Sequence, residues 1–211
     1  MKYADIKPND IANGPGVRVS LFASGCRHAC PGCFNAEARD FNFGMNFTQE
    51  TIDQVITFLQ RDYIEGLTLL GGEPLAPENQ ESIRDLIKQV KEKIPNKSIR
   101  CYSGFTYEFI QQYMVPNLPY ASAIMQNIDV LVDGKWIEAL ANLNLRFRGS
   151  SNQRVIDVQR TRKSGEIVWA LGRIEQAKYV EVPLFTQKDI KLVEIYKQRQ
   201  LELQTVKKIQ S

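Results

Sequence analysis

The residues of this chain best suited to chemistry are three cysteines in one short loop. Cys26, Cys30 and Cys33 are spaced Cys-x3-Cys-x2-Cys and make up three of the four cysteines in 211 residues. An apolar, β-branched run at residues 17–22 precedes them. Cysteine thiolates bind zinc and iron–sulfur clusters. Three of them on one loop favour a metal or cluster site over three unrelated core cysteines.

The number of thiols leaves the metal open. A structural zinc site takes four ligands, and Cys101 and His28 are the candidates for the fourth. Cys101 lies within a predicted strand, which favours a small buried hydrophobe. His28 lies between two of the cysteines, and we interpret it as a polar loop residue. A four-iron cluster also normally takes four thiolates, so three would leave one iron open to a small molecule with a chelating amine and carboxylate.

The rest of the chain alternates predicted strands with predicted helices. Residues 1–16 are expected to form a polar entry segment. Strands are expected at residues 17–22, 67–70, 98–102, 129–132 and 154–158, with 167–169 as a further candidate, and helices at 48–59, 78–93 and 106–113. This alternation is typical of parallel βαβ units, either in a doubly wound sheet or in an open or partial barrel.

Polar motifs that contain glycine follow four of the predicted strands. They are Ser24-Gly25-Cys26, Gly71-Gly72-Glu73-Pro74, Ser103-Gly104 and Asp133-Gly134-Lys135. In parallel α/β folds, binding sites form at the carboxyl ends of the strands. The four motifs therefore predict a single pocket. Trp136, which follows the last motif, is expected to belong to the core.

Composition sets limits on the partners and on the location. A formal net charge of +3 with 43% hydrophobic residues does not indicate a polyanionic partner such as nucleic acid. No apolar stretch of about 18 residues or signal-peptide core is present, so we expect no membrane association and a cytoplasmic protein, where thiols stay reduced.

The C-terminal quarter differs from the rest of the chain. Residues 159–211 are modestly basic, and Thr186-x-x-Asp189 resembles a capping box ahead of a helix that reaches toward Ile209. We expect one domain at residues 1–158 and a helical or irregular extension at 159–211, packed on the same domain.

Several motifs together carry a family resemblance. The cysteine spacing resembles the cluster motif of the radical S-adenosylmethionine (SAM) enzymes, and Gly71-Gly72-Glu73-Pro74 resembles their second motif. Asn13-Gly14-Pro15-Gly16-Val17-Arg18 is similar to a segment of the glycyl-radical-enzyme activases. The segments at 30–35, 132–135 and 146–157 resemble the activating proteins of anaerobic ribonucleoside-triphosphate reductase. The resemblance covers residues 5–158 and implies an α/β fold, an open partial (β/α) barrel of radical SAM type.

The resemblance also implies cofactors, chemistry and partners. Cys26, Cys30 and Cys33 would bind three irons of a 4Fe–4S cluster, and SAM would bind the fourth iron through its amine and carboxylate. Reductive cleavage of SAM would give a 5′-deoxyadenosyl radical, which in the family takes a hydrogen atom from a glycine of the reductase large subunit. A flavodoxin or ferredoxin would supply the electron, and a homodimer is expected.

Further residues would bind SAM by the same resemblance. Gly71, Gly72 and Glu73 would receive its ammonium group. Gly32, Cys33 and Phe34 would flank the adenine. The remaining three positions would be Ser103 at the ribose, Lys135 at the carboxylate and Asp133 beside a monovalent cation.

Other functions compete with this interpretation. One is activation of another glycyl-radical enzyme or SAM chemistry on a small molecule. Another, from a different class, is a zinc-binding interaction module without catalysis. The short chain and the run Arg146-Phe147-Arg148-Gly149-Ser150-Ser151-Asn152 favour the reductase activase.

Overall fold

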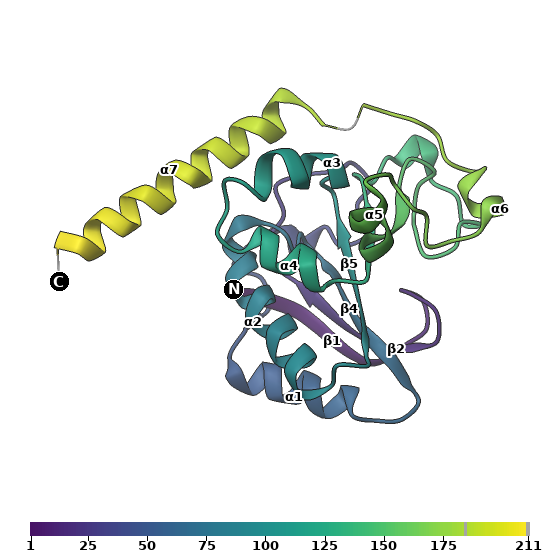
Figure 1. The fold of residues 1–211 in the computed structure, drawn as a ribbon, viewed down its shortest axis with the longest axis horizontal. Coiled ribbons are helices and arrows are strands. Elements are labelled where there is room, and N and C mark those ends of the chain that lie inside the picture. The colour runs from purple at the N-terminus through teal and green to yellow at the C-terminus, as the bar shows by residue number, and fades with distance from the viewer. Residues whose placement is uncertain (184, 210–211) are drawn as a thin grey trace.

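A mixed sheet forms the centre of the fold, which is α/β as predicted. The structure is a computed structural model, which describes residues 1–183 and 185–209. Within these residues, seven strands pair in the order β3-β1-β2-β4-β5-β6-β7 (Figure 1). The strands are β1 (Lys2–Asp10), β2 (Val17–Ala23), β3 (Met45–Asn46), β4 (Ile64–Gly71), β5 (Ser98–Ser103), β6 (Val130–Asp133) and β7 (Arg154–Asp157).

The four central strands are parallel and the outer ones are not. Strands β2, β4, β5 and β6 run in one direction, whereas β1 pairs antiparallel with β2 and β7 pairs antiparallel with β6. The carboxyl ends of the four parallel strands therefore meet at one edge of the sheet, as the βαβ alternation predicted.

The helices carry the residues that cover the sheet. They are α1 (Gln49–Leu59), α2 (Pro77–Lys93), α3 (Tyr107–Phe109), α4 (Ala121–Asn127), α5 (Val158–Ser164), α6 (Arg173–Gln176) and α7 (Gln187–Ile209). Apolar residues of α1, α2 and α4, such as Val55, Leu86 and Ile124, pack with Leu21 and Leu69 of the strands in one core. Cys101 is part of that core, as predicted.

Two local predictions were wrong, and a third was right in extent but not in helix type. The expected polar entry segment contains β1, whose polar residues such as Asp5 and Lys7 pair along β2 instead of forming a loop. Residues 167–169 contribute only one isolated bridge, between Trp169 and Ile156. The helix expected at residues 106–113 is present, but only α3 is α-helical and the helix continues as a π-helical turn at Ile110–Met114.

The helix expected after Thr186 is present as α7. It begins at Gln187, and Val193 and Tyr196 near its start pack into the core, while its far half extends away from the body (Figure 1). The Thr186 amide donates to Asp189 Oδ2 at 2.8 Å, which is one half of the predicted capping box.

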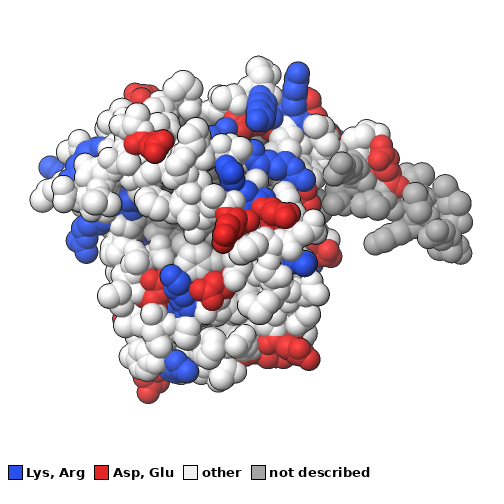
Figure 2. Space-filling view, turned by 180° about the vertical axis from the view of Figure 1, so that it is seen from behind, with Lys and Arg blue, Asp and Glu red and all other residues white. Residues whose placement is uncertain are grey.

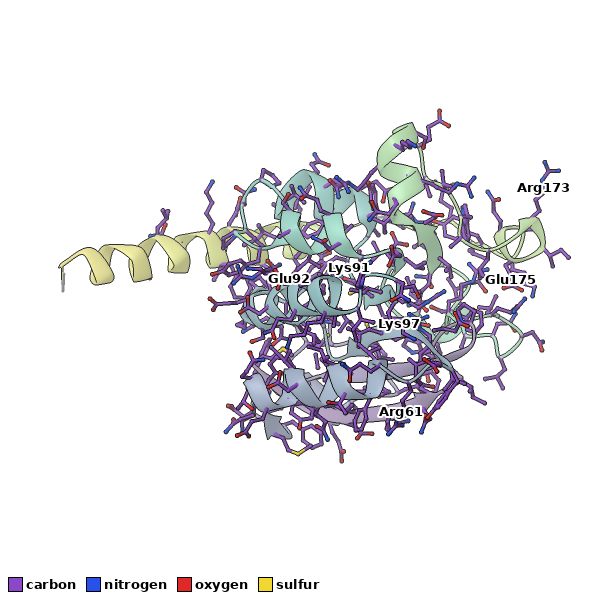
Figure 3. All side chains as sticks on the ribbon, turned by 60° about the horizontal axis from the view of Figure 1, so that its bottom comes forward. Arg61, Lys91, Glu92, Lys97, Arg173 and Glu175 are labelled. Atoms are coloured by element: carbon purple, nitrogen blue, oxygen red, sulfur yellow. The ribbon has the colours of Figure 1, made fainter. Side chains whose placement is uncertain are left out.

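Surface charges are mixed in sign. Lys, Arg, Asp and Glu side chains lie among neutral surface on the face in Figure 2, some of them next to a side chain of opposite charge, in keeping with the small net charge of +3. Lys97, just before β5, donates to the carbonyl of Arg61, just before β4, at 3.1 Å (both residues are labelled in Figure 3). Among the described residues, no helix combines the length and the apolar character needed to cross a membrane.

Candidate functional site

The cysteine loop is fixed where it leaves β2. The Gly25 amide donates to the Ala38 carbonyl at 2.8 Å, and the Cys26 amide donates to the Arg39 carbonyl at 3.0 Å. Ala38 and Arg39 belong to a 3-10 turn at Glu37–Arg39 that follows the loop. These bonds close residues 25–39 into a ring at the edge of the sheet. The first cysteine is thereby held directly at the end of a parallel strand.

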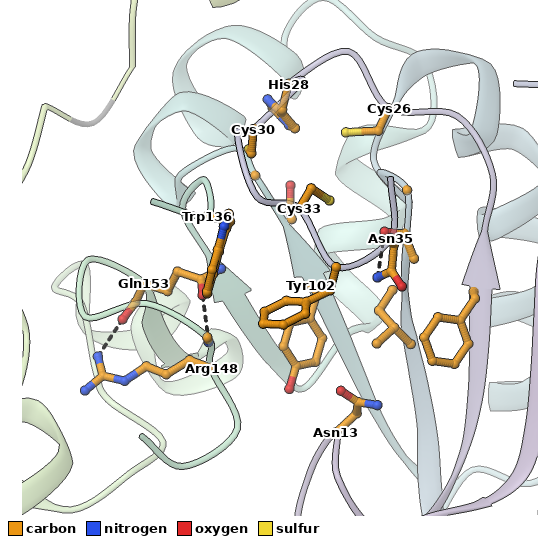
Figure 4. A pocket seen from close by; sticks show the side chains of 18 of the residues that line it. Asn13, Cys26, His28, Cys30, Cys33, Asn35, Tyr102, Trp136, Arg148 and Gln153 are labelled. Carbon is orange, nitrogen blue, oxygen red and sulfur yellow. Dashed lines mark hydrogen bonds between the residues drawn. The ribbon is translucent and has the colours of Figure 1, made fainter. Parts of the chain in front are cut away.

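All three loop cysteines line one cavity, as the strand-end motifs predicted. The cavity has a volume of about 650 Å³. Figure 4 shows the three thiols along one side of it, with Tyr102 and Trp136 on other sides. The following residues, which the sequence singled out, line this cavity: Cys26, Cys30, Cys33, Phe34, Gly71, Gly72, Ser103, Gly104 and Gly134.

The donor set of this cavity fits an iron–sulfur cluster. The three cysteines are half-buried and form no disulfide. No acidic side chain is among the described residues that line the cavity. Thiolates are the ligands of iron–sulfur clusters, whereas magnesium and calcium prefer carboxylates. Among the described residues, no three histidine, cysteine, aspartate or glutamate side chains are arranged around a single metal ion.

Burial raises the pKa values of two thiols of the cysteine loop. It raises the pKa of Cys26 to about 12, and the charge of Glu73 adds to the effect. The thiol of Cys30 also has a raised pKa, for which burial is the main cause. Both side chains are therefore neutral thiols in the metal-free protein at pH 7, and binding of iron must displace their protons.

Glu73 connects three parts of the site. It is 2% exposed, and its carboxylate accepts hydrogen bonds from the Leu75 amide (2.9 Å), the Ser103 hydroxyl (2.9 Å) and the Gly104 amide (2.7 Å). His28 Nε2 lies 2.8 Å from its Oε2. The Glu73 amide in turn donates to the Gly25 carbonyl at 2.8 Å. Glu73 thus ties the cysteine loop to the ends of β4 and β5.

His28 is a polar residue of the cysteine loop, as predicted, but its side chain is enclosed by the protein. Only 5% of its side chain is exposed, and its ring packs edge-on against Phe105 with the centroids 4.4 Å apart. A Cβ on Gly104 would lie 2.4 Å from His28 Cδ2, so the histidine fits only because residue 104 has no side chain.

The glycines of the second motif allow close backbone approach. Gly71 has a φ of +104°, and a Cβ there would lie 2.6 Å from the Ala23 carbonyl oxygen. The side-chain amide nitrogen of Asn35 donates to the Gly71 carbonyl at 3.4 Å (Figure 4). The turn after β4 therefore lies directly against β2 and the cysteine loop.

Asp133 and Lys135 each have an ion-pair partner in the protein. Asp133 is buried, and Arg154 Nε donates to its Oδ1 at 3.0 Å. Arg154 also binds Glu108, so its guanidinium lies beside Asp133 where the resemblance implied a cation. Lys135 Nζ lies 2.7 Å and 2.9 Å from the two carboxylate oxygens of Asp189, at the start of α7. The C-terminal extension thus reaches the edge of the site.

Sequence reasoning missed part of the cavity wall. Trp136 lines the cavity and packs T-shaped on the ring of Phe34, with the centroids 4.9 Å apart, so its prediction as a core residue was wrong. Phe34 itself is 77% exposed. Tyr102 donates to the Phe147 carbonyl at 2.8 Å, and both residues face the cavity. The signal for Trp136 was its position directly after a strand-end motif.

Comparison with known proteins identifies the family. Residues 12–156 match the family described as a 4Fe-4S single cluster domain. The anaerobic ribonucleoside-triphosphate reductase-activating protein of Enterobacteria phage T4 is 40% identical over 155 residues, which cover 74% of this chain and 93% of the phage protein. The protein of the same name from Vibrio cholerae is 40% identical over 155 residues, covering 72% of this chain and 96% of the relative.

A third relative gives the same result. The Escherichia coli protein of that name is 38% identical over 157 residues, covering 74% of this chain and 97% of the relative. Apart from Lys7, the residues that line the cysteine cavity lie within the matched family domain, whereas residues 157–211 lie beyond it. The chain belongs to the family of anaerobic ribonucleoside-triphosphate reductase-activating proteins.

Proposed function

We propose that this chain is the iron–sulfur and SAM-dependent activase that generates the glycyl radical on an anaerobic ribonucleoside-triphosphate reductase. The observation that carries the proposal is the meeting of three thiols and the strand-end glycines in one cavity of about 650 Å³. Such a cavity has room for a cluster and for a ligand of nucleoside size.

The cofactors supply the electron chemistry. When bound, the reduced 4Fe–4S cluster would supply the electron for reductive cleavage of SAM to methionine and a 5′-deoxyadenosyl radical. The chain itself would hold the cluster through Cys26, Cys30 and Cys33. The lack of a fourth cysteine in the loop leaves one iron for the amine and carboxylate of SAM.

The turn after β4 and the end of β5 would position the SAM ammonium and ribose. Backbone groups at Gly71 and Gly72 are proposed to receive the SAM ammonium, because glycine permits close approach. Glu73 would hold that turn in place, because its carboxylate already contacts four other groups of the protein. Ser103 is one of them, so its contact with the ribose would use the remaining lone pair of its hydroxyl.

Residues at the mouth of the cavity would bind the adenine and the carboxylate of SAM. Gly32 and Phe34 would flank the adenine, with the Phe34 ring held in place by Trp136. Lys135 would bind the SAM carboxylate only by sharing its ammonium with Asp189. Asp133 is proposed to act through Arg154, whose guanidinium supplies the positive charge beside it.

Further parts of the proposal concern architecture and partners. The sheet would be an open partial (β/α) barrel of radical SAM type, with residues 1–158 as its domain and 159–211 as an extension packed on it. A flavodoxin or ferredoxin would donate the electron, the protein would be a cytoplasmic homodimer, and its target would be the reductase large subunit. The parallel order β2-β4-β5-β6 around the cavity supports the barrel.

One anaerobic assay tests the activity. Reduced protein, SAM and the reductase are mixed and examined by electron paramagnetic resonance for a glycyl radical. The proposal predicts a radical signal that requires all three components and is lost with Cys30→Ala. Formation of 5′-deoxyadenosine without a radical on the reductase would point to a different target. A colourless protein with one zinc per chain would reject the cluster altogether.

A further inference from the structure

A second cavity lies next to the cysteine cavity and is walled by the C-terminal extension. Its volume is about 320 Å³. The two cavities adjoin, because five residues line both of them: His28, Cys30, Gly104, Gly134 and Trp136. The outer wall lies beyond the family domain that ends at residue 156, and it is formed by Tyr179, Val182, Pro183, Phe185 and Thr186. The alignment with the phage relative covers 93% of that protein but only 74% of this chain.

The charged side chains around this second cavity are already neutralised. Lys135 is bound by both carboxylate oxygens of Asp189. Arg154 is bound by Asp133 and by Glu108. A charged ligand would have to break one of these pairs, which is costly for partly buried ions. The cavity is therefore suited to an uncharged ligand.

Two neutral polar atoms in the cavity wall lack a partner. Trp136 Nε1 is a buried donor and Asn152 Oδ1 is a buried acceptor, and neither has a hydrogen bond. Asn152 is 4% exposed. Its side-chain nitrogen Nδ2 donates to the Lys135 carbonyl at 2.8 Å, so the atom without a partner is the side-chain oxygen Oδ1. Buried polar groups are costly when unsatisfied. A ligand with one acceptor and one donor would satisfy both atoms.

Much of the remaining wall is apolar, and its other polar residues are His28, Thr106, Tyr179 and Thr186. Pro31 and Ile137 line it from the cluster side, and Val182, Pro183 and Phe185 line it from the extension. An uncharged group that accepts one hydrogen bond and donates another, attached to an apolar body, describes a peptide unit with its side chain.

We infer that the second cavity binds a polypeptide segment of the reductase, with a peptide carbonyl accepting from Trp136 Nε1, a peptide amide donating to Asn152 Oδ1, and an apolar side chain against Val182. This inference rests on the proposed function for the source of the segment. A glycine that loses a hydrogen atom must enter the first cavity, so the chain beside that glycine must lie along an adjoining surface. The second cavity provides that surface.

A pair of matched substitutions tests the inference. Val182→Trp fills the second cavity, whereas Val180→Trp places the same side chain on the same segment at a residue that is 43% exposed. A fluorescein-labelled peptide that carries the radical glycine of the reductase is titrated into each holoenzyme under anaerobic conditions. Val182→Trp is expected to weaken binding of the peptide by about tenfold or more, and Val180→Trp to leave it as in wild type. Iron content and melting temperature verify that both variants are folded.

A crosslinking measurement covers the case in which the tryptophan variant does not fold. Val182→p-benzoylphenylalanine should photocrosslink to the full reductase, and the same residue at position 180 should not. Equal peptide affinity in both tryptophan variants, or equal crosslinking from both positions, would overturn the inference while wild-type radical formation leaves the proposed function standing. If wild type neither binds nor activates the reductase, the proposed function fails and the inferred occupant fails with it.

Discussion

Nε2 of His28 lies 2.8 Å from Oε2 of Glu73, and this contact joins the cysteine loop to the turn after β4. The two residues are 45 positions apart in the chain. Gly104 and Ser103 donate to the same carboxylate, so one buried acid organises three segments. The geometry of the cluster loop therefore depends on a residue that does not itself line the cysteine cavity.

Glu73→Gln is expected to destabilise the protein by about 2–3 kcal/mol, because an amide nitrogen would face backbone and hydroxyl donors that now reach a carboxylate. Chemical denaturation of the apoprotein measures the change. Glu81→Gln is the matched control, since Glu81 is exposed and accepts one bond from Tyr120. Equal stability of the two variants would show that Glu73 does not organise the site.

Cys30→Ala and Cys101→Ala are expected to separate cluster binding from packing. Cys30→Ala should abolish the visible absorbance of the anaerobically reconstituted protein, because one of three thiol ligands is removed. Cys101 is fully buried in β5, so its replacement should keep the iron and cost about 1 kcal/mol of stability. Iron and sulfide analysis together with thermal melts gives both results. Loss of iron from Cys101→Ala would assign that residue to the cluster.

Arg154→Ala is expected to cost about 3–5 kcal/mol, since it leaves the buried Asp133 without its cation. Arg154→Lys should recover only part of this loss, because lysine lacks the fork that binds Asp133 and Glu108 together. Arg160→Ala, on the exposed face of α5, should be neutral. Urea titration distinguishes the three variants. A stable Arg154→Ala protein would mean that another cation replaces the guanidinium.

Docking of α7 should weaken in acid. Burial acts to raise the pKa of Asp189, but hydrogen bonds from Lys135 and Thr186 outweigh it, so the folded pKa lies below the ordinary aspartate value. A carboxyl with a lowered folded pKa stabilises the docked form above its unfolded pKa of about 3.9, and the stabilisation is lost as pH falls through the folded pKa. The apoprotein should therefore stay docked down to about pH 4 and release α7 below it.

Tryptophan emission reports this release, because Trp136 lines the second cavity and Trp169 packs against Tyr179 of the extension. Far-ultraviolet circular dichroism shows whether the core remains folded over the same range. In Asp189→Asn the acid-dependent component of the emission change should be absent. A profile identical to wild type would show that Asp189 does not hold the extension.

Local sequence patterns predicted the parallel strands and the shared cavity well. The strand over residues 98–102 and the motif Ser103-Gly104 were visible because apolar residues and glycine mark local conformation. The strand β1 was missed because its polar residues outnumber its apolar ones. The contact between Lys135 and Asp189 joins residues 54 positions apart, and periodicity carries no information about such pairs. The buried place of His28 depends in the same way on a distant glycine.

The direction of β7 sets a length requirement on the chain that follows it. Because β7 runs against β6, the chain leaves the sheet at the edge opposite the cysteine loop and must travel back to place Asp189 beside Lys135. Residues 165–186 are the tether that makes this return. A tether shorter than the distance from the end of α5 to Asp189 would hold α7 out of reach even with every contact residue intact, whereas a lengthened one would merely slacken. Spacing between residues 165 and 186 is thus as much a determinant of the second cavity as the side chains that line it.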